Sequence, residues 1–137
     1  MIKGIAHACY TVSDMEATLA FYCEGLGLQK AFDYRDEQGH LYGAYVYVGG
    51  RTFVEFFEGE LAERAEKQAY SHLCLEVDDL EATVAELEAK GISTTPIKRG
   101  KDRSYQSWIS DPDGNRIELH DYTPESKQTL HLNSVGN

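Results

Sequence analysis

The sequence predicts an α+β fold in which two βαβββ modules follow one another along the chain. Residues 7–18 (HACYTVSDMEAT) and 72–83 (HLCLEVDDLEAT) share His, Cys, Val, Asp, Glu, Ala and Thr at a constant offset of 65 residues. Each copy also ends in a similar strand, residues 54–56 (VEF) and 117–119 (IEL). Such a repeat indicates one supersecondary unit used twice, and neither copy buries its apolar face alone. A chain of 137 residues has the length of one domain made of two such modules.

Module one, residues 1–60, begins with a predicted strand at 5–12, which is rich in small, aromatic and β-branched residues. Ser13 and Glu16 match a capping box, and apolar residues at helical spacing follow them, so we expect a helix that ends near the glycines at 25 and 27. Three further strands are expected, separated by a turn at Gly39 and by the Gly49-Gly50 pair. Their predicted ranges are 28–34, 41–48 and 52–57.

Module two, residues 71–123, repeats this order after a linker at 61–70 that has room for one helical turn. Asp78 and Glu81 form the expected capping box of its helix, and the DPDG turn at 111–114 delivers the last strand. The predicted elements are strands at 72–77, 92–97, 104–110 and 115–122 and a helix at about 79–90. Residues 124–137 are polar and are expected to form a loosely held tail.

The repeat places one histidine and one glutamate at matching positions in each module: His7 and Glu55, then His72 and Glu118. In a curved sheet, alternate side chains point into the concave face, so the four residues are candidates for one shared site. Two carboxylates about 4 Å apart repel by roughly 4 kcal/mol at an effective dielectric of 20. A divalent cation removes that repulsion, and two imidazoles with two carboxylates suit Zn, Ni, Co, Mn or Fe(II) better than Ca.

Other candidate residues have weaker support from the sequence. His120 shares the strand face of Glu118, but its counterpart in the repeat is Phe57, so we leave it out of the predicted ligand set. Cys9 and Cys74 occupy equivalent positions and are expected to be small buried thiols. The basic residues of 98–103 form either a solvated loop or a receptor for an anionic group. The aromatic residues of the strands are expected to pack on the sheets, with a few lining a cleft: Tyr34, Tyr42, Tyr45, Tyr47, Phe53, Tyr105 and Trp108.

Composition limits the partners and the compartment. The formal charge of −10 argues against binding to nucleic acid or to an anionic membrane, since both need a basic face. Three cysteines in strand-like segments, no signal-peptide pattern and no apolar run of about 20 residues predict a protein of the cytoplasm that acts on a small molecule.

The whole pattern resembles the vicinal oxygen chelate superfamily, and in particular its glyoxalase I (lactoylglutathione lyase) branch. The resemblance covers residues 2–122, and its most specific segments are 110–119 (SDPDGNRIEL) and 7–28 (HACYTVSDMEATLAFYCEGLGL). By position it assigns the four metal ligands to His7, Glu55, His72 and Glu118. It further implies one divalent ion per site and helices on the outer face of a curved mixed sheet. Homodimers with a paired barrel are also implied, in which module one of one chain faces module two of the other.

The activity that this resemblance implies is an isomerising lyase reaction through a metal-stabilised enediolate. Glu118 is the first choice of base, and Glu55 is its symmetric alternative. Members of that branch usually carry an Arg and an Asn that contact glutathione where this chain has Thr11 and Gly59. Either Arg35, Arg51 or the basic loop replaces that anchor, or the substrate is a different α-hydroxycarbonyl or thiol adduct. The alternatives are a non-haem Fe(II) dioxygenase, a thiol transferase of the fosfomycin-resistance type, an epimerase and a metal-free, bleomycin-resistance-like binding protein.

Overall fold

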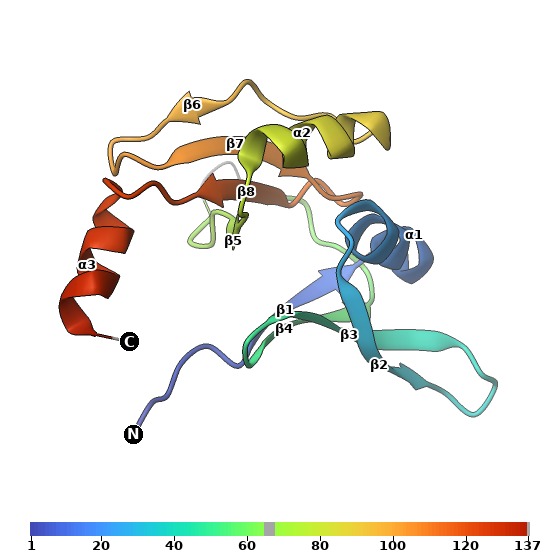
Figure 1. Ribbon diagram of the computed structural model, residues 1–137. Helices are drawn as coiled ribbons and strands as arrows, with labels where there is room; N and C mark the ends of the chain where they lie inside the picture. The colour runs from blue at the N-terminus through green and yellow to red at the C-terminus, as the bar shows by residue number, and fades with distance from the viewer. Residues whose placement is uncertain (65–67, 137) are drawn as a thin grey trace. The chain divides into compact units, whose positions relative to one another are not determined.

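The computed structural model, which describes residues 1–64 and 68–136, divides into two compact units, Met1–Gln68 and Ala69–Asn137 (Figure 1). Each unit contains one four-stranded mixed sheet. The predicted α+β class is therefore confirmed, and so is the use of one topology twice. Both sheets are open, with two edge strands each, so the closed paired barrel that the resemblance implied is not what either unit forms.

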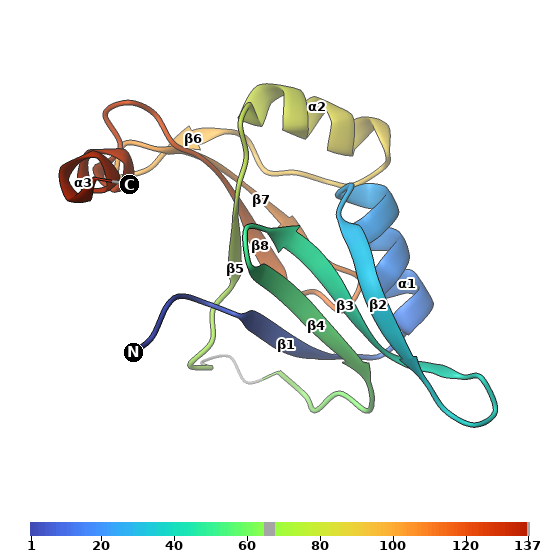
Figure 2. The same cartoon turned by 60° about the horizontal axis from the view of Figure 1, so that its bottom comes forward.

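The first unit has the strand order β1-β4-β3-β2 (Figure 2). β1 and β4 run parallel, while the β4–β3 and β3–β2 pairs are antiparallel, as expected when a helix joins the first two strands and tight turns join the others. Its elements are β1 (His7–Val12), α1 (Met15–Leu19), a π-helical turn η1 (Ala20–Gly25), β2 (Gln29–Arg35), β3 (Leu41–Gly49) and β4 (Thr52–Glu58).

The second unit has the equivalent order β5-β8-β7-β6, again with a parallel first pair. Its elements are β5 (Leu73–Glu76), α2 (Leu80–Ala89), β6 (Lys98–Arg99), β7 (Tyr105–Ser110), β8 (Arg116–Asp121) and α3 (Lys127–Val135). The predicted DPDG turn is confirmed: Asp111 Oδ1 accepts hydrogen bonds from the backbone N–H groups of Asp113 and Asn115, and Gly114 has a φ of 77°.

Alternation along the strands gives each sheet two different faces. In the first unit, Val12, Val54 and Phe56 are almost fully buried, and Phe56 packs on Tyr22 of the helical segment with ring centroids 4.7 Å apart. The opposite face carries His7 and the other odd-numbered residues of β1. The hydrophobic core therefore lies on the helix side, and the polar candidates lie on the other face of the same sheet.

Helices α1 and α2 each begin one residue later than their capping boxes predicted. Asp14 and Asp79 are the N-caps, and their carboxylates accept hydrogen bonds from the backbone N–H groups of Ala17 and Ala82, each at 2.9 Å. Ser13 and Asp78 were therefore wrong as caps. The carboxylate of an N-cap residue satisfies an N–H at the third helical position, and here the aspartate nearest the helix makes that bond.

One further expectation about local structure was wrong, and two segments need a separate description. No strand forms over residues 92–97, because Pro96 has no N–H to donate and Thr95 instead bonds to Trp108 through both its backbone and its hydroxyl group. The described part of the predicted linker, 61–64 and 68–70, contains no helical turn, and residues 65–67 lie outside the described residues. The expected loose tail contains α3, which begins after a fully buried Ser126.

Candidate functional site

The first candidate pair is formed by His7 at the start of β1 and Glu55 in the middle of β4. His7 Nε2 lies 3.3 Å from Glu55 Oε2, and Glu55 is only 9% exposed. The imidazole also meets the edge of the Tyr45 ring, with centroids 5.4 Å apart. A buried carboxylate and a histidine thus face each other beside an aromatic wall, on the sheet face that the helix does not cover.

The second pair repeats this arrangement. His72, which directly precedes β5, places Nε2 at 3.2 Å from Oε2 of Glu118 on β8, and Glu118 is again 9% exposed. The ring of Trp108 stands where Tyr45 stands in the first unit, 4.7 Å from the His72 ring centroid. Each predicted His therefore contacts its predicted Glu within its own unit.

Strand register explains why the pairs are equivalent. In each unit the parallel partner of the glutamate is a cysteine, and its antiparallel partner is an aromatic residue. A row of thiol, carboxylate and aromatic ring therefore crosses three strands, and the histidine lies two residues before the cysteine. These rows consist of Cys9, Glu55 and Tyr45 in the first unit and of Cys74, Glu118 and Trp108 in the second.

The cysteines are not the buried residues that the sequence suggested, since Cys9 and Cys74 are both exposed. They lie on the open face with the glutamates rather than in the helix-side core. Partial desolvation of the sulfur and the neighbouring carboxylate raise the pKa of Cys9 to about 11, and the same two causes raise the pKa of Cys74 to about 12. Both thiols are therefore protonated at neutral pH when no ion is bound.

His120 lies beside Cys74 and Glu118, although it was left out of the predicted ligand set. It is 7% exposed, and one of its ring nitrogens, the Cys74 sulfur and a Glu118 oxygen all lie within 4.8 Å of one another. Its Nε2 lies 3.2 Å from Oδ2 of Asp102. The repeat gave no signal for this residue, because Phe57 stands at the matching place; the signal was its position on the same strand face as Glu118.

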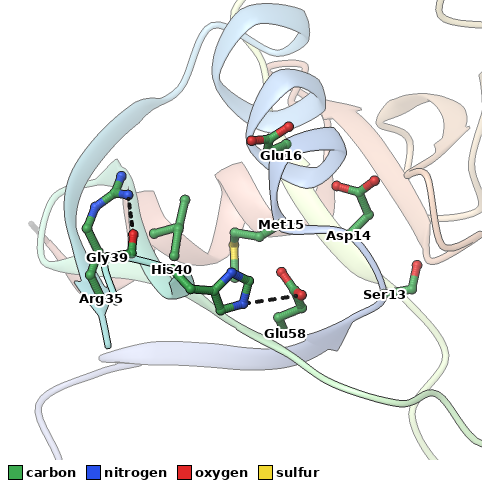
Figure 3. Close-up of a pocket in the computed structure, with 9 residues that line it drawn as sticks. Ser13, Asp14, Met15, Glu16, Arg35, Gly39, His40 and Glu58 are labelled. Atoms are coloured by element: carbon green, nitrogen blue, oxygen red, sulfur yellow. Dashed lines mark hydrogen bonds and ion pairs between the residues drawn. The ribbon is translucent and has the colours of Figure 1, made fainter. Parts of the chain in front are cut away.

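A separate cavity of about 470 Å³ lies in the first unit, near the start of α1 and the β2–β3 turn (Figure 3). Figure 3 shows His40 and Glu58 facing each other in it, and His40 Nε2 is 3.5 Å from Glu58 Oε1. Arg35 lines the same cavity and donates to the carbonyl oxygen of Gly39. Neither His7 nor Glu55 lines this cavity, so it is distinct from the first candidate pair.

Comparison with known proteins decides the family. The family model described as the Glyoxalase/Bleomycin resistance protein/Dioxygenase superfamily matches residues 4–119 of this chain. The chain belongs to this superfamily. The resemblance to vicinal oxygen chelate proteins is thereby confirmed at the level of the superfamily.

Several relatives carry different functional names. The chain is 32% identical to the uncharacterized protein YwkD of Bacillus subtilis, over 88% of this chain and 98% of YwkD. It is 28% identical to a probable lactoylglutathione lyase of Vibrio parahaemolyticus, over 84% and 88% of the two chains, and 26% identical to the metallothiol transferase FosB of Staphylococcus epidermidis, over 96% and 92%. Among solved structures, a glyoxalase family protein from Enterococcus faecalis matches with a TM-score of 0.74 and 27% identity, over 86% of this chain and 97% of that chain.

Two departures from the glyoxalase I pattern lie side by side in this superfamily member. Thr11 is the second-to-last residue of β1, and Gly59 follows β4 and donates its backbone N–H to the carbonyl oxygen of Val12. A Cβ atom added to Gly59 would lie 3.0 Å from the Thr11 methyl group. Any side chain at position 59 would therefore crowd Thr11, so the two small residues fit each other.

Two of the cationic residues considered as replacements for those anchors form ion pairs. Arg35 lies 3.4 Å from Asp33, and Arg99 of the basic segment lies 2.6 Å from Glu125.

Across residues 1–64 and 68–136, no helix has both the length and the apolar character needed to cross a membrane.

Proposed function

We propose that the protein is a metal-dependent lyase or isomerase of the glyoxalase I type, which acts on an α-hydroxycarbonyl or thiohemiacetal substrate. One observation carries the proposal: a buried glutamate faces a histidine at equivalent strand positions of both units, at 3.3 and 3.2 Å. A polar pair that is kept twice on an otherwise aromatic sheet face indicates a shared chemical purpose.

The donor set fits a divalent ion. Two neutral imidazoles and two carboxylates give zero net charge around a dication, and their mixed nitrogen and oxygen atoms suit Ni, Zn or Co, with Fe and Mn as further candidates. The four proposed ligands are His7, Glu55, His72 and Glu118. When bound, the ion would act as a Lewis acid for negative charge that develops on substrate oxygen.

We assign the proton transfer to Glu118, with Glu55 as its symmetric counterpart. The glutamate removes the proton from the hydroxyl-bearing carbon and returns it to the neighbouring carbonyl carbon, while the hydroxyl proton moves between the two oxygens. Tyr45 and Trp108 stand beside His7 and His72. General acid–base catalysis of this kind contributes about 10² to 10⁴ in rate.

The substrate and the assembly are part of the same proposal. Thr11 and Gly59 offer neither charge nor amide to a tripeptide thiol, which favours a smaller substrate or a different thiol adduct. We further propose a homodimer in which the His7 and Glu55 pair of one chain serves the same ion as the His72 and Glu118 pair of the other. Such an assembly uses the repeated topology of the two units in a symmetric way.

The test is turnover of a set of thiohemiacetals by the Ni²⁺- and Zn²⁺-loaded protein and its variants. We expect Glu118→Gln to lower kcat by about 10² or more, because an amide cannot accept the carbon-bound proton. Glu55→Gln should also impair turnover, while Glu58→Gln, on the same strand as Glu55, should leave it near the wild-type rate. Unchanged turnover in both Glu118→Gln and Glu55→Gln would contradict the assigned roles.

Thiol transfer is the second candidate, and the similarity to FosB over most of both chains favours it. A transferase would consume a free thiol and an electrophilic second substrate in equal amounts. An isomerase would leave the total thiol content unchanged after the thioester product is hydrolysed. Measuring free thiol over the course of the reaction separates the two candidates.

A further inference from the structure

The two units differ at the open-face position two residues after the glutamate. In the second unit, the Cys74 sulfur, a Glu118 oxygen and a His120 ring nitrogen lie within 4.8 Å of one another. Within residues 1–64 and 68–136, no other group of three such ligand atoms is this compact. The first unit has the matching cysteine and glutamate but carries Phe57 where the second has His120.

The burial of His120 and its neighbouring carboxylate are typical of a metal-binding histidine. Its side chain is more than nine-tenths buried, and its Nε2 has no hydrogen-bond partner among the described residues, although Asp102 Oδ2 lies 3.2 Å away. A histidine that binds a metal usually turns its other ring nitrogen toward a carboxylate, which fixes the ring. Asp102 Oδ2, 3.2 Å from Nε2, would supply that carboxylate when the ion is bound by Nδ1.

Asp102 is in turn fixed by the C-terminal helix. Gln128 of α3 donates from Nε2 to Asp102 Oδ2 at 2.6 Å, and the backbone N–H of Ser104 donates to Oδ1 at 3.2 Å. These bonds, the first above all, lower the pKa of Asp102 and keep it anionic. A chain of contacts thus runs from Gln128 of α3 through Asp102 to His120. These contacts link α3 to the candidate ligand.

We propose that Cys74, Glu118 and His120 form a metal-binding site of the second unit alone, with Asp102 orienting His120. Sulfur, oxygen and nitrogen donors together suit a borderline-soft dication such as Zn²⁺ or Co²⁺, and a thiolate with a carboxylate neutralises its charge. The inference goes beyond the proposed function, because it requires neither His7 nor Glu55 and no turnover. The two share only Glu118.

The test is titration of the metal-free, full-length protein with Co²⁺, followed by the thiolate-to-cobalt charge-transfer absorption and by equilibrium dialysis. The His7→Ala/Glu55→Gln double variant should keep this absorption and bind about one Co²⁺ per chain. In the background of that double variant, Cys74→Ser, at an exposed position, should lose the absorption and bind Co²⁺ at least about tenfold more weakly. Cys9→Ser, the equivalent change in the first unit, is the matched control and should behave as the wild type.

Gln128→Ala tests the contacts that position His120 without replacing a ligand or Asp102. It should weaken Co²⁺ binding by roughly tenfold while the charge-transfer band remains. The inference is overturned if Cys74→Ser keeps the band, or if the double variant loses it. Unchanged turnover in Glu55→Gln and Glu118→Gln would instead contradict the proposed function, so the two failures are distinguishable.

Discussion

At the scale of single residues, the internal repeat predicted which His and Glu residues pair, but it did not predict the exposure or the contacts of their neighbours. It identified both His and Glu pairs because a shared position in two modules is visible in the letters alone. It did not reveal that Cys9 and Cys74 are exposed, since a small thiol in a strand is compatible with either face. It also missed His120, whose contacts to Asp102 and Cys74 depend on segments far apart in the sequence.

Thiol reactivity tests the environment of Glu55 directly. In metal-free protein at pH 8, Cys9 should be alkylated slowly, because raising its pKa from 9.0 to about 11 lowers the thiolate fraction about a hundredfold. Part of that rise comes from the Glu55 carboxylate, so Glu55→Gln should accelerate the alkylation of Cys9 when the rate is followed by peptide mass spectrometry.

Cys74 provides the internal control for that experiment. Its neighbour is Glu118, so its alkylation rate should not change in Glu55→Gln but should rise in Glu118→Gln. Equal effects of both variants on both cysteines would show that the individual carboxylates do not set the two pKa values.

At the scale of elements, strands and turns were predictable where the signal is local. Alternation predicted seven of the strand regions to within a few residues, and the DPDG and Gly49-Gly50 turns lie where the sequence places them. The strand predicted at 92–97 does not form, because the hydroxyl group of Thr95 bonds to Trp108 and Pro96 has no N–H to donate to a neighbouring strand. Helix α3 was missed because Gln128 bonds to Asp102 and Ser104, which are distant in the sequence, and a polar sequence does not reveal such contacts.

The N-caps give a prediction that separates adjacent residues. Asp79→Ala should destabilise the protein by about 1 kcal/mol, because the Ala82 N–H loses its partner at the start of α2. The corresponding fall in Tm is about 3 to 4 °C for a chain of this size. Asp78→Ala, which changes the residue that the capping box predicted, should shift Tm by less than about 1 °C. Thermal unfolding followed by circular dichroism measures both, and equal shifts would contradict the cap assignment.

At the scale of the whole molecule, one topology used twice gives two half-sites of the same composition. Each half-site has one imidazole and one carboxyl group, so neither alone supplies the four protein ligands of the proposed centre. His120 breaks this equivalence, since within residues 1–64 and 68–136 only the second unit brings three such ligand atoms within 4.8 Å of one another. The units are therefore alike in fold and different in their expected affinity for an isolated ion.

Complementation between two inactive variants tests whether the proposed centre is shared between chains. One variant carries His7→Ala and Glu55→Gln, and the other carries His72→Ala and Glu118→Gln, so each alone should be inactive. In a dimer with shared sites, a mixed pair has one site whose ligands are all intact and one that lacks all four. Random re-association of equal amounts should then restore about a quarter of the wild-type turnover. If both half-sites of a centre came from the same chain, mixing would restore nothing, because every centre would retain one damaged half.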